Sequence, residues 1–282
     1  MSTASRRFVA TALAVSTLGA CSTRPQAQST PTPPAGATDV AARLAASPRH
    51  GEWVMVPSGS SDSLRAWIVF PERSDPAPVV VVIHEIFGLS TWIRGVADQL
   101  AAEGFIAIAP DLLTGKAPLG PGDSLTNEVA TSVIRTLQAD EVHRRIADVA
   151  QYAMRLPAAE KKYGIVGFCW GGSTSFQHAV RSPEGLGAAV VYYGGSPSPA
   201  SLSSVRVPVL GLYAGDDARV NSTVPAADSA MRALGKSFEF RMFDSSGHGF
   251  LRQQDGRDGA NLAASRQSWP MAINFFRKHL GA

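Results

Sequence analysis

The chain has 282 residues, 45% of them hydrophobic and 17% charged, so it can bury a sizeable core and is not intrinsically disordered. The formal net charge is +3, and two of the 26 basic residues, Arg6 and Arg7, lie in a segment that we expect to be removed. The other 24 basic residues nearly balance the 23 acidic ones and form no dense basic patch, which argues against a nucleic-acid partner.

The first twenty residues predict export. Two arginines precede an apolar run over residues 8–18, which is too short to anchor the chain stably across a bilayer. The ending Leu18-Gly19-Ala20-Cys21 resembles a bacterial lipoprotein signal, in which the cysteine becomes the lipidated first residue. We therefore expect residues 1–20 to be a lipoprotein-type signal peptide, and the protein to lie in the periplasm or cell envelope with membrane contact through a lipid at Cys21. An ordinary cleaved signal, with Cys21 incidental, is the alternative.

The next segment differs in composition from the rest of the chain. Residues 22–38 are rich in Pro, Thr, Ser, Gln and Ala, a composition that cannot bury a core. We assign residues 21–45 to a flexible tether and residues 46–282 to a single folded domain without internal repeats.

Buried strands alternate with amphipathic helices along this domain. The continuous β-branched run from Val79 to Ile83 is typical of a central parallel strand that is covered on both faces. Further strands are expected at residues 52–56, 64–70, 105–109, 165–168, 188–193, 207–214 and 238–243, and helices around 93–100, 142–156, 173–181 and 269–280. This alternation predicts an α/β fold with a mostly parallel sheet and helices on both of its faces.

One stretch has the pattern of a nucleophile elbow. In Gly167-Phe168-Cys169-Trp170-Gly171, an apolar strand meets a helix at a sharp turn that carries a cysteine between glycines. A Cβ at either glycine would crowd strand against helix, and the helix N-terminus favours a thiolate at Cys169. Alternatively, Cys169 is a small, inert, buried residue in a glycine-rich loop.

Two other strand ends supply a possible base and acid. His248 stands between Gly247 and Gly249, which allow close approach of the loop and leave the imidazole projecting. Asp217 follows the strand over residues 207–214, although the adjacent Asp216 could take the same role and either could be a helix cap. The chain order Cys169, Asp217, His248 matches the nucleophile-acid-base order of α/β-hydrolases. A surface-loop histidine is the alternative interpretation of His248.

These motifs together resemble the dienelactone hydrolase (carboxymethylenebutenolidase) family over about residues 52–280. The resemblance rests on Gly167-Phe168-Cys169-Trp170-Gly171-Gly172, on His84-Glu85-Ile86-Phe87-Gly88, on Asp217 three residues before Val220, and on Gly247-His248-Gly249-Phe250. It implies the α/β-hydrolase fold.

The resemblance also implies roles for individual residues. Cys169 would be the nucleophile of a triad with His248 and Asp217, and Glu85 would contact the resting thiol and help to take its proton when substrate binds. The backbone amides of Ile86 and Trp170 would form the oxyanion hole, as geometry also suggests for the amide after the nucleophile. Arg252 matches an arginine that binds the substrate carboxylate, and a solvated loop arginine is the alternative interpretation.

One feature departs from the family pattern. The family enzyme has a second carboxylate-binding arginine after the Pro-Asp-Leu strand end, whereas this chain has only Lys116 between Arg94 and Arg135. The missing arginine puts the dienelactone substrate itself in doubt.

The sequence therefore predicts an ester or lactone hydrolase that acts through a thioester acyl-enzyme. Neither a metal nor an organic cofactor is expected, because the histidines and cysteines lack ligand spacing. Two alternatives remain: a general carboxylesterase or thioesterase of the same fold, and a non-catalytic exported binding lipoprotein. Labelling of Cys169 by an electrophile no faster than a free thiol would favour the latter.

Overall fold

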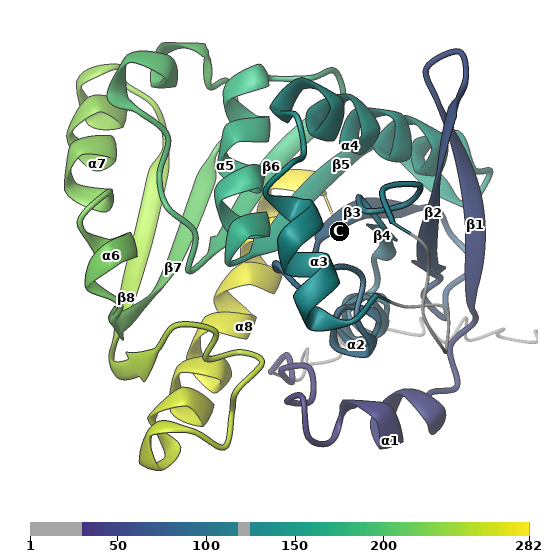
Figure 1. Ribbon diagram of the computed structural model, residues 1–282, viewed down its shortest axis with the longest axis horizontal. Helices are drawn as coiled ribbons and strands as arrows, with labels where there is room; N and C mark the ends of the chain where they lie inside the picture. The colour runs from purple at the N-terminus through teal and green to yellow at the C-terminus, as the bar shows by residue number, and fades with distance from the viewer. Residues whose placement is uncertain (1–29, 118–124, 282) are drawn as a thin grey trace, which may run out of the picture. The chain divides into compact units, whose positions relative to one another are not determined.

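The computed structural model describes residues 30–117 and 125–281 (Figure 1). The predicted signal peptide and Cys21 lie outside the described residues, so export and lipidation stay predictions. A compact unit begins at Pro31. Within the described ranges, no helix combines the length and apolarity that crossing a membrane requires.

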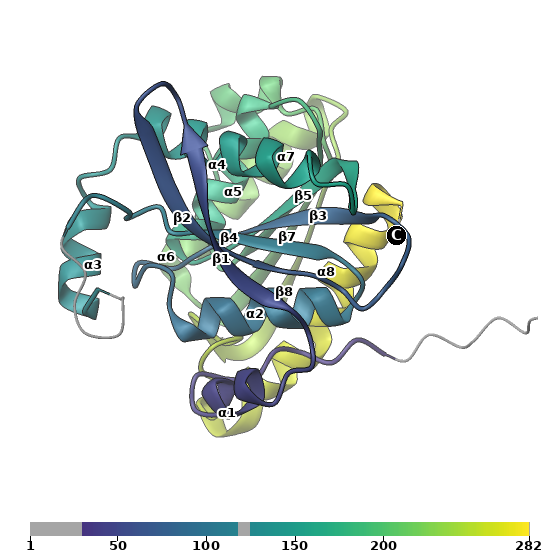
Figure 2. The same cartoon turned by 90° about the vertical axis from the view of Figure 1, so that its right-hand side faces the viewer.

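A single mixed sheet forms the centre of this unit. Among the described residues it has eight strands in the order β1-β2-β4-β3-β5-β6-β7-β8 (Figures 1 and 2). β2 runs antiparallel to both β1 and β4, and all other neighbours are parallel. The strands are β1 (Gly51–Ser58), β2 (Asp62–Val69), β3 (Ala77–Ile83), β4 (Ile106–Pro110), β5 (Ala159–Phe168), β6 (Leu186–Tyr192), β7 (Val209–Asp216) and β8 (Phe238–Gly247). The predicted, mostly parallel α/β fold is confirmed.

Helices cover both faces of the sheet (Figure 2). α2 and α8 pack on one face, and α4, α5 and α7 on the other. The helices are α1 (Val40–Ala45), α2 (Thr91–Ala102), α3 (Asn127–Ile134), α4 (Ala139–Met154), α5 (Trp170–Arg181), α6 (Ala218–Asn221), α7 (Val224–Ala233) and α8 (Ala260–Leu280), with 3₁₀ turns at Pro199–Ser204 and Arg257–Gly259.

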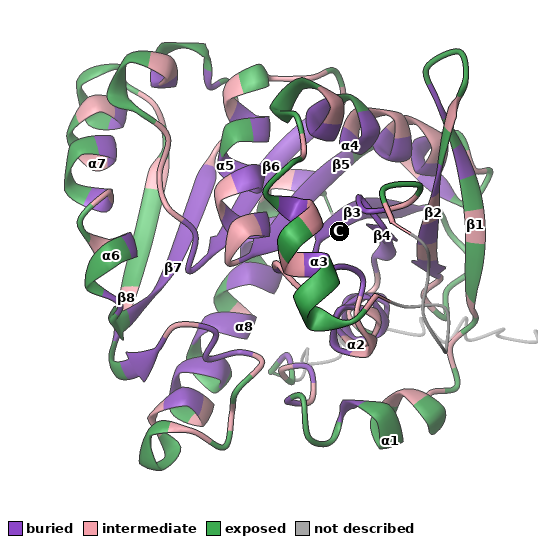
Figure 3. Cartoon of the chain, viewed as in Figure 1, coloured by how far each residue is buried: buried purple, intermediate pink, exposed green. Residues whose placement is uncertain are grey.

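The central strand β3 explains how this arrangement follows from the sequence. Every residue from Ala77 to Ile83 is buried (Figure 3). Val80 and Val82 belong to the core beneath α2 and α8, whereas Val79 and Val81 belong to the core beneath α4 and α5. Since side chains alternate between the faces of a strand, only an uninterrupted apolar run suits a strand with two covered faces.

Part of the segment that we assign to the tether is folded. Residues 31–45 belong to the compact unit and include α1. Val40 is buried against α2, where a Cβ on Gly95 would lie only 2.2 Å from its Cγ2. The Ala37 amide also donates to the Arg252 carbonyl at 2.8 Å. The domain therefore extends further toward the N-terminus than composition suggests, because one well-placed valine and a few backbone contacts fasten a polar segment.

Candidate active site

The predicted sharp turn between β5 and α5 is present. Cys169 has φ 58° and ψ −115°, a conformation that non-glycine residues rarely adopt and that costs about 1–3 kcal/mol. A Cβ on Gly167 would lie 1.9 Å from the carbonyl oxygen of Gly171, and a Cβ on Gly171 would lie 2.4 Å from that of His84. The two glycines therefore allow the strand, the turn and the helix to pack closely enough to hold Cys169 in this conformation.

The charge state of the thiol differs from our expectation. Burial raises the pKa of Cys169 to about 11, and the negative charge of Glu85 acts in the same direction. A hydrogen bond from the Trp170 amide and the charge of Arg219 lower this pKa, but by less. The expected preference for a thiolate at the helix N-terminus is therefore wrong for the resting protein, because desolvation outweighs the helix dipole.

His248 and Asp217 lie in contact at the carboxyl ends of β8 and β7. The imidazole Nδ1 is 2.5 Å from Oδ2 of Asp217, and the other carboxylate oxygen accepts from the amide of Val220 at 3.4 Å. The aspartate is buried and fixed in place as the cap of α6. Asp216 points elsewhere and forms an ion pair with Arg257. Of the two candidate aspartates, Asp217 is thus the one that can orient the imidazole.

Glu85 follows β3 and is paired with Arg252. Oε2 of Glu85 lies 2.6 Å from Nε of Arg252, and only 4% of the glutamate side chain is exposed. Burial raises the pKa of Glu85 to about 7, although the charge of Arg252 lowers it in part. The guanidinium also lies over the ring of Phe87, 5.0 Å from its centroid. A carboxyl group that titrates near neutrality therefore lies beside a thiol whose pKa it raises.

The loop after β3 lies against the start of α5. A Cβ on Gly171 would crowd the carbonyl oxygens of both Ile83 and His84. The side chains of Ile86 and Trp170 pack on the same small apolar cluster, which contains Leu113. This contact brings the two residues whose amides we expect in the oxyanion hole into one region beside Cys169.

Tyr193 is a site residue that we did not single out from the sequence. It has φ 39°, and its buried hydroxyl finds no hydrogen-bond partner in the part of the chain that the structure describes. Its ring packs edge-on against His248 with the centroids 5.2 Å apart. Burial raises the pKa of Tyr193, as do the charges of Glu85 and Cys169. In the sequence it looks like the last residue of a core strand, and no local signal distinguishes it from a packing residue.

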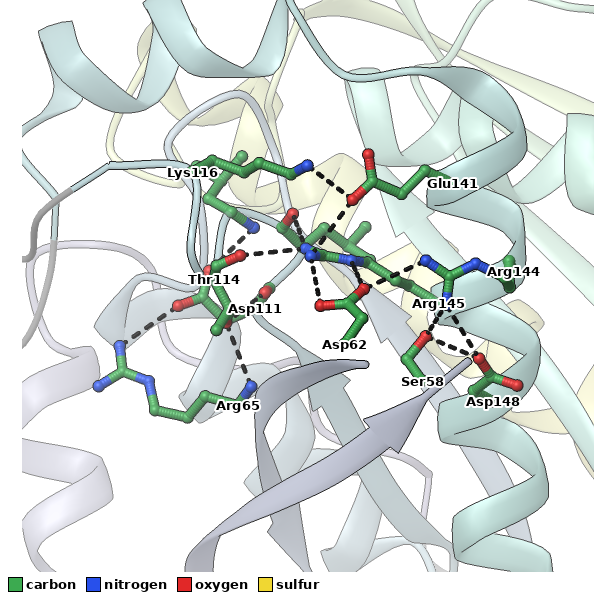
Figure 4. A network of polar contacts seen from close by, with 12 residues as sticks. Ser58, Asp62, Arg65, Asp111, Thr114, Lys116, Glu141, Arg144, Arg145 and Asp148 are labelled. Carbon is green, nitrogen blue, oxygen red and sulfur yellow. Dashed lines mark hydrogen bonds and ion pairs between the residues drawn. The ribbon is translucent and has the colours of Figure 1, made fainter. Parts of the chain in front are cut away.

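A polar network holds the segment after β4 (Figure 4). At its centre is Arg145 of α4, whose side chain is 5% exposed. It donates to both carboxylate oxygens of Asp62, at 2.9 and 3.0 Å, and to the carbonyls of Leu112 and Thr114 at 3.1 and 3.2 Å. These bonds fasten the loop that carries Leu113, because they satisfy backbone carbonyls inside the protein.

Lys116 also belongs to this network. Its Nζ lies 2.6 Å from Oε1 of Glu141 (Figure 4). The lysine between Arg94 and Arg135 is therefore already paired with a carboxylate, which Arg145 shares at 3.3 Å.

Comparisons with known proteins identify the family to which the chain belongs. A model of the dienelactone hydrolase family matches residues 64–280. The chain belongs to the dienelactone hydrolase family. Membership places it among hydrolases of esters and lactones with the α/β-hydrolase fold, as the sequence motifs predict.

Individual relatives and structures support the assignment. A protein of Salmonella typhi, provisionally named carboxymethylenebutenolidase, is 32% identical over 239 residues, which cover 80% of this chain and 86% of that protein. A solved structure of a provisionally assigned dienelactone hydrolase from Klebsiella pneumoniae has a TM-score of 0.72 and 27% identity, covering 82% of this chain and 99% of its own. A dienelactone hydrolase-like promiscuous phosphotriesterase from metagenomic libraries has a TM-score of 0.69 and 25% identity, covering 82% and 98%.

Proposed function

We propose that the protein hydrolyses an ester or lactone by two-step acyl transfer, with Cys169 as nucleophile, His248 as base and Asp217 as the group that orients the base. The 2.5 Å contact between His248 and Asp217, at the strand ends beside a strained cysteine turn, is the observation that carries this proposal. A carboxylate on Nδ1 fixes the tautomer whose Nε2 can accept a proton.

The resting thiol needs activation before it can attack. With pKa values of about 11 for Cys169 and about 7 for Glu85, moving the thiol proton to the glutamate is unfavourable by roughly 5 kcal/mol. Arg252 makes Glu85 less basic, so a substrate anion that drew the guanidinium away would raise the pKa of Glu85. We propose that Glu85 then takes the thiol proton, which generates the thiolate when substrate is present.

The acyl transfer then follows in two balanced steps. The thiolate adds to the carbonyl carbon, and the amides of Ile86 and Trp170 bind the oxyanion, where one such donor is worth roughly 3–4 kcal/mol. Collapse of the tetrahedral intermediate expels the alkoxide, and the proton that Glu85 took from the thiol passes through His248 to this oxygen, which leaves as the alcohol. His248 next removes a proton from water, hydroxide adds to the thioester, and the acid leaves as the thiol is restored.

The decisive variant is Cys169→Ala. We expect it to abolish hydrolysis of 4-nitrophenyl butyrate while the thermal unfolding curve stays close to that of the wild-type protein. Cys21→Ser serves as the matched control because it removes the other cysteine and should leave turnover unchanged. Turnover by the Cys169→Ala protein would refute the nucleophile assignment.

The general carboxylesterase or thioesterase remains distinguishable by substrate. Equal rates on neutral short esters and on a carboxylate-bearing lactone, with no loss in Arg252→Ala, would favour it.

The non-catalytic alternative needs a different test from the one that the sequence suggests. Because burial raises the thiol pKa, slow labelling of the resting protein is expected for an enzyme too. Absence of turnover across esters, thioesters and lactones would support a binding protein.

We also propose export and lipidation, supported by the ending Leu18-Gly19-Ala20-Cys21. Expression in a bacterium with labelled palmitate should place the label and the protein in the membrane fraction. Cys21→Ser should lose both, whereas Cys169→Ser should keep them. An unlabelled protein in the periplasmic fraction would indicate an ordinary cleaved signal instead.

A further inference from the structure

A second concave region adjoins the candidate active site. It is a cavity of about 280 Å³ between the first two strands, the loop after β3, the start of α2 and the segment after β4. Trp53, Phe87 and Leu113 supply apolar walls, and Arg94 lies at one side. The cavity reaches the site through two of these residues: Phe87 lies beneath the guanidinium of Arg252, and Leu113 packs in one cluster with Ile86 and Trp170.

Unlike other arginines nearby, Arg94 has no carboxylate as an ion-pair partner among the described residues. Arg49 pairs with Asp98 at 2.6 Å, and Arg252 pairs with Glu85. Half-buried Arg94 donates to Thr91 Oγ1 at 3.2 Å and lies 5.8 and 5.5 Å from the rings of Trp53 and Trp67, but it forms no ion pair with any carboxylate that the structure describes. Burial, and then the charge of Arg65, lower the pKa of Arg94 without neutralising it at physiological pH.

Among the residues that the structure describes, the charged side chains lining the cavity carry a net positive charge. Its charged lining in the described ranges consists of Arg65, Arg94 and Asp111. The single carboxylate lies 3.3 Å from Nη2 of Arg65 and also accepts from the amide of Leu113 at 3.3 Å. A negatively charged group would therefore be most stable at the side of the cavity where Arg94 lies. A guanidinium with open donors in a partly desolvated pocket binds a carboxylate in a fixed orientation.

We propose that this cavity is a substrate subsite in which Arg94 binds a carboxylate on the part of the ester that is remote from the scissile bond. The inference rests on the proposed ester hydrolysis and names the substrate class it favours: half-esters or lactone-derived acids with an apolar segment between the reacting carbonyl and the anion. It also addresses the departure from the family pattern. The expected second arginine is missing after β4 and Lys116 is paired with Glu141, but Arg94 offers a cation from a different element, α2.

Arg94 and Arg252 would act differently in this arrangement. Arg252 contacts Glu85 and thereby influences the thiol, so its loss affects catalysis itself. Arg94 contacts neither Glu85 nor the His248–Asp217 pair among the contacts described here, so its loss should weaken binding of anionic substrates without altering the chemical step. This contrast predicts a change in KM rather than in kcat.

The test compares anionic substrates with neutral counterparts of equal shape. One series places the charge on the acyl side, as mono-4-nitrophenyl esters of dicarboxylic acids of increasing length against their terminal amides. The other places it on the leaving group, as butyrate esters of 3- and 4-hydroxybenzoate against the hydroxybenzamides. In at least one series the wild-type kcat/KM should favour the anion, and Arg94→Gln should reduce the ratio about tenfold through KM, whereas Arg94→Lys retains part of it.

A second variant keeps the test decisive if Arg94→Gln folds poorly. Asn127→Asp adds a negative charge at the exposed rim of the cavity, at the first position of α3 where an acidic residue is well tolerated. It should reduce the same ratio. Arg135→Gln is the matched control, because it removes one positive charge at the exposed end of α3 outside the cavity and should leave the ratio unchanged. Turnover of 4-nitrophenyl butyrate should stay near wild type in the control variant Arg135→Gln.

Two results would overturn the subsite. One is an anion-to-neutral ratio within twofold of wild type in both series for Arg94→Gln and Asn127→Asp. The other is measured by calorimetry and does not depend on turnover. It is a preference for binding hexanoate over hexanamide that is absent in the wild type or unchanged in both variants. Loss of hexanoate binding in both would support the subsite even if no ester were hydrolysed, so a failure of the proposed hydrolysis is separable from a failure of this inference.

Discussion

Glu85 Oε2 lies 2.6 Å from Arg252 Nε, and the charge of this same glutamate raises the pKa of the Cys169 thiol. The ion pair therefore connects a residue suited to meeting a substrate anion with the sulfur that we propose as nucleophile. Because only 4% of the Glu85 side chain is exposed, solvent screens the interactions of its charge poorly. The state of this one carboxyl group should consequently be measurable both in the stability of the protein and in the reactivity of its cysteine.

The pH dependence of stability should change in Glu85→Gln. In the wild type the folded-state pKa is about 7 and the ordinary value is 4.5, so between these pH values the native state binds more protons than the unfolded state. Stability from this group is therefore present at low pH and is lost as pH rises from about 4.5 to about 7, by roughly 3 kcal/mol in total.

Glu85→Gln removes this titration, so its free energy of unfolding should increase relative to that of the wild type as the pH rises from 5 to 8. Denaturant unfolding at four pH values measures the difference. The matched control is Glu184→Gln, an exposed position that should run parallel to wild type. A constant offset between Glu85→Gln and wild type over this range would contradict the raised pKa.

The thiol of the resting protein should react slowly. A pKa of about 11 instead of the ordinary 9.0 reduces the thiolate fraction at pH 7 about a hundredfold, so iodoacetamide should alkylate Cys169 far more slowly than a free thiol. In a Cys21→Ser background only Cys169 is labelled. Glu85→Gln should accelerate labelling by removing a nearby negative charge, whereas Asp216→Asn, whose carboxylate pairs with Arg257, should not. Equal rates in Glu85→Gln and its parent would show that Glu85 does not influence the sulfur.

Much of the fold can be predicted from the sequence because the decisive signals are local. The run from Val79 to Ile83 can only be a strand with two apolar faces, and the glycines around Cys169 and His248 mark turns that need space. Asp217 and Asp216 are indistinguishable by propensity. Only the path of the chain after β7 turns one toward His248 and the other toward Arg257.

The features that the sequence does not predict depend on three-dimensional surroundings. The direction of the Cys169 pKa shift results from competition between burial and a helix terminus, and burial is unknown before the fold is known. Tyr193 ends a predicted core strand, and its contact with the ring of His248 becomes visible only in the folded chain. Helix α1 lies in a segment of tether-like composition and is held by the buried side chain of Val40 and by a hydrogen bond from Arg43 to Gln99.

The close packing at the turn should make Gly171→Ala severe. A Cβ there would lie 2.4 and 2.5 Å from the carbonyl oxygens of His84 and Ile83, which are backbone atoms that cannot rotate away. We expect a loss of about 3 kcal/mol or more in unfolding free energy, together with loss of turnover from displacement of the loop that carries Ile86. Gly195→Ala is the control, since the nearest atom to its Cβ would be 3.7 Å away. Similar stability of the two variants, measured by thermal unfolding, would count against the packing described here.

The buried network around Arg145 should contribute much more to stability than an exposed ion pair of the same type. Arg145→Ala leaves Asp62 without a major partner and two backbone carbonyls without donors, so we expect a loss of about 3–5 kcal/mol. Arg181→Ala is the matched comparison on the neighbouring helix α5. It breaks a pair with Asp140, whose side chain is 89% exposed, and should cost less than about 1 kcal/mol.

The same change should also affect the proposed subsite, because Arg145 holds the segment that carries Leu113 into the cavity wall. Below its unfolding transition, Arg145→Ala should therefore show a reduced preference for carboxylate-bearing esters over their amides, while Arg181→Ala keeps the wild-type preference. Urea unfolding measures the first effect and the kcat/KM ratio measures the second. Equal unfolding free energies for the two variants would mean that the network in Figure 4 does not hold the loop after β4.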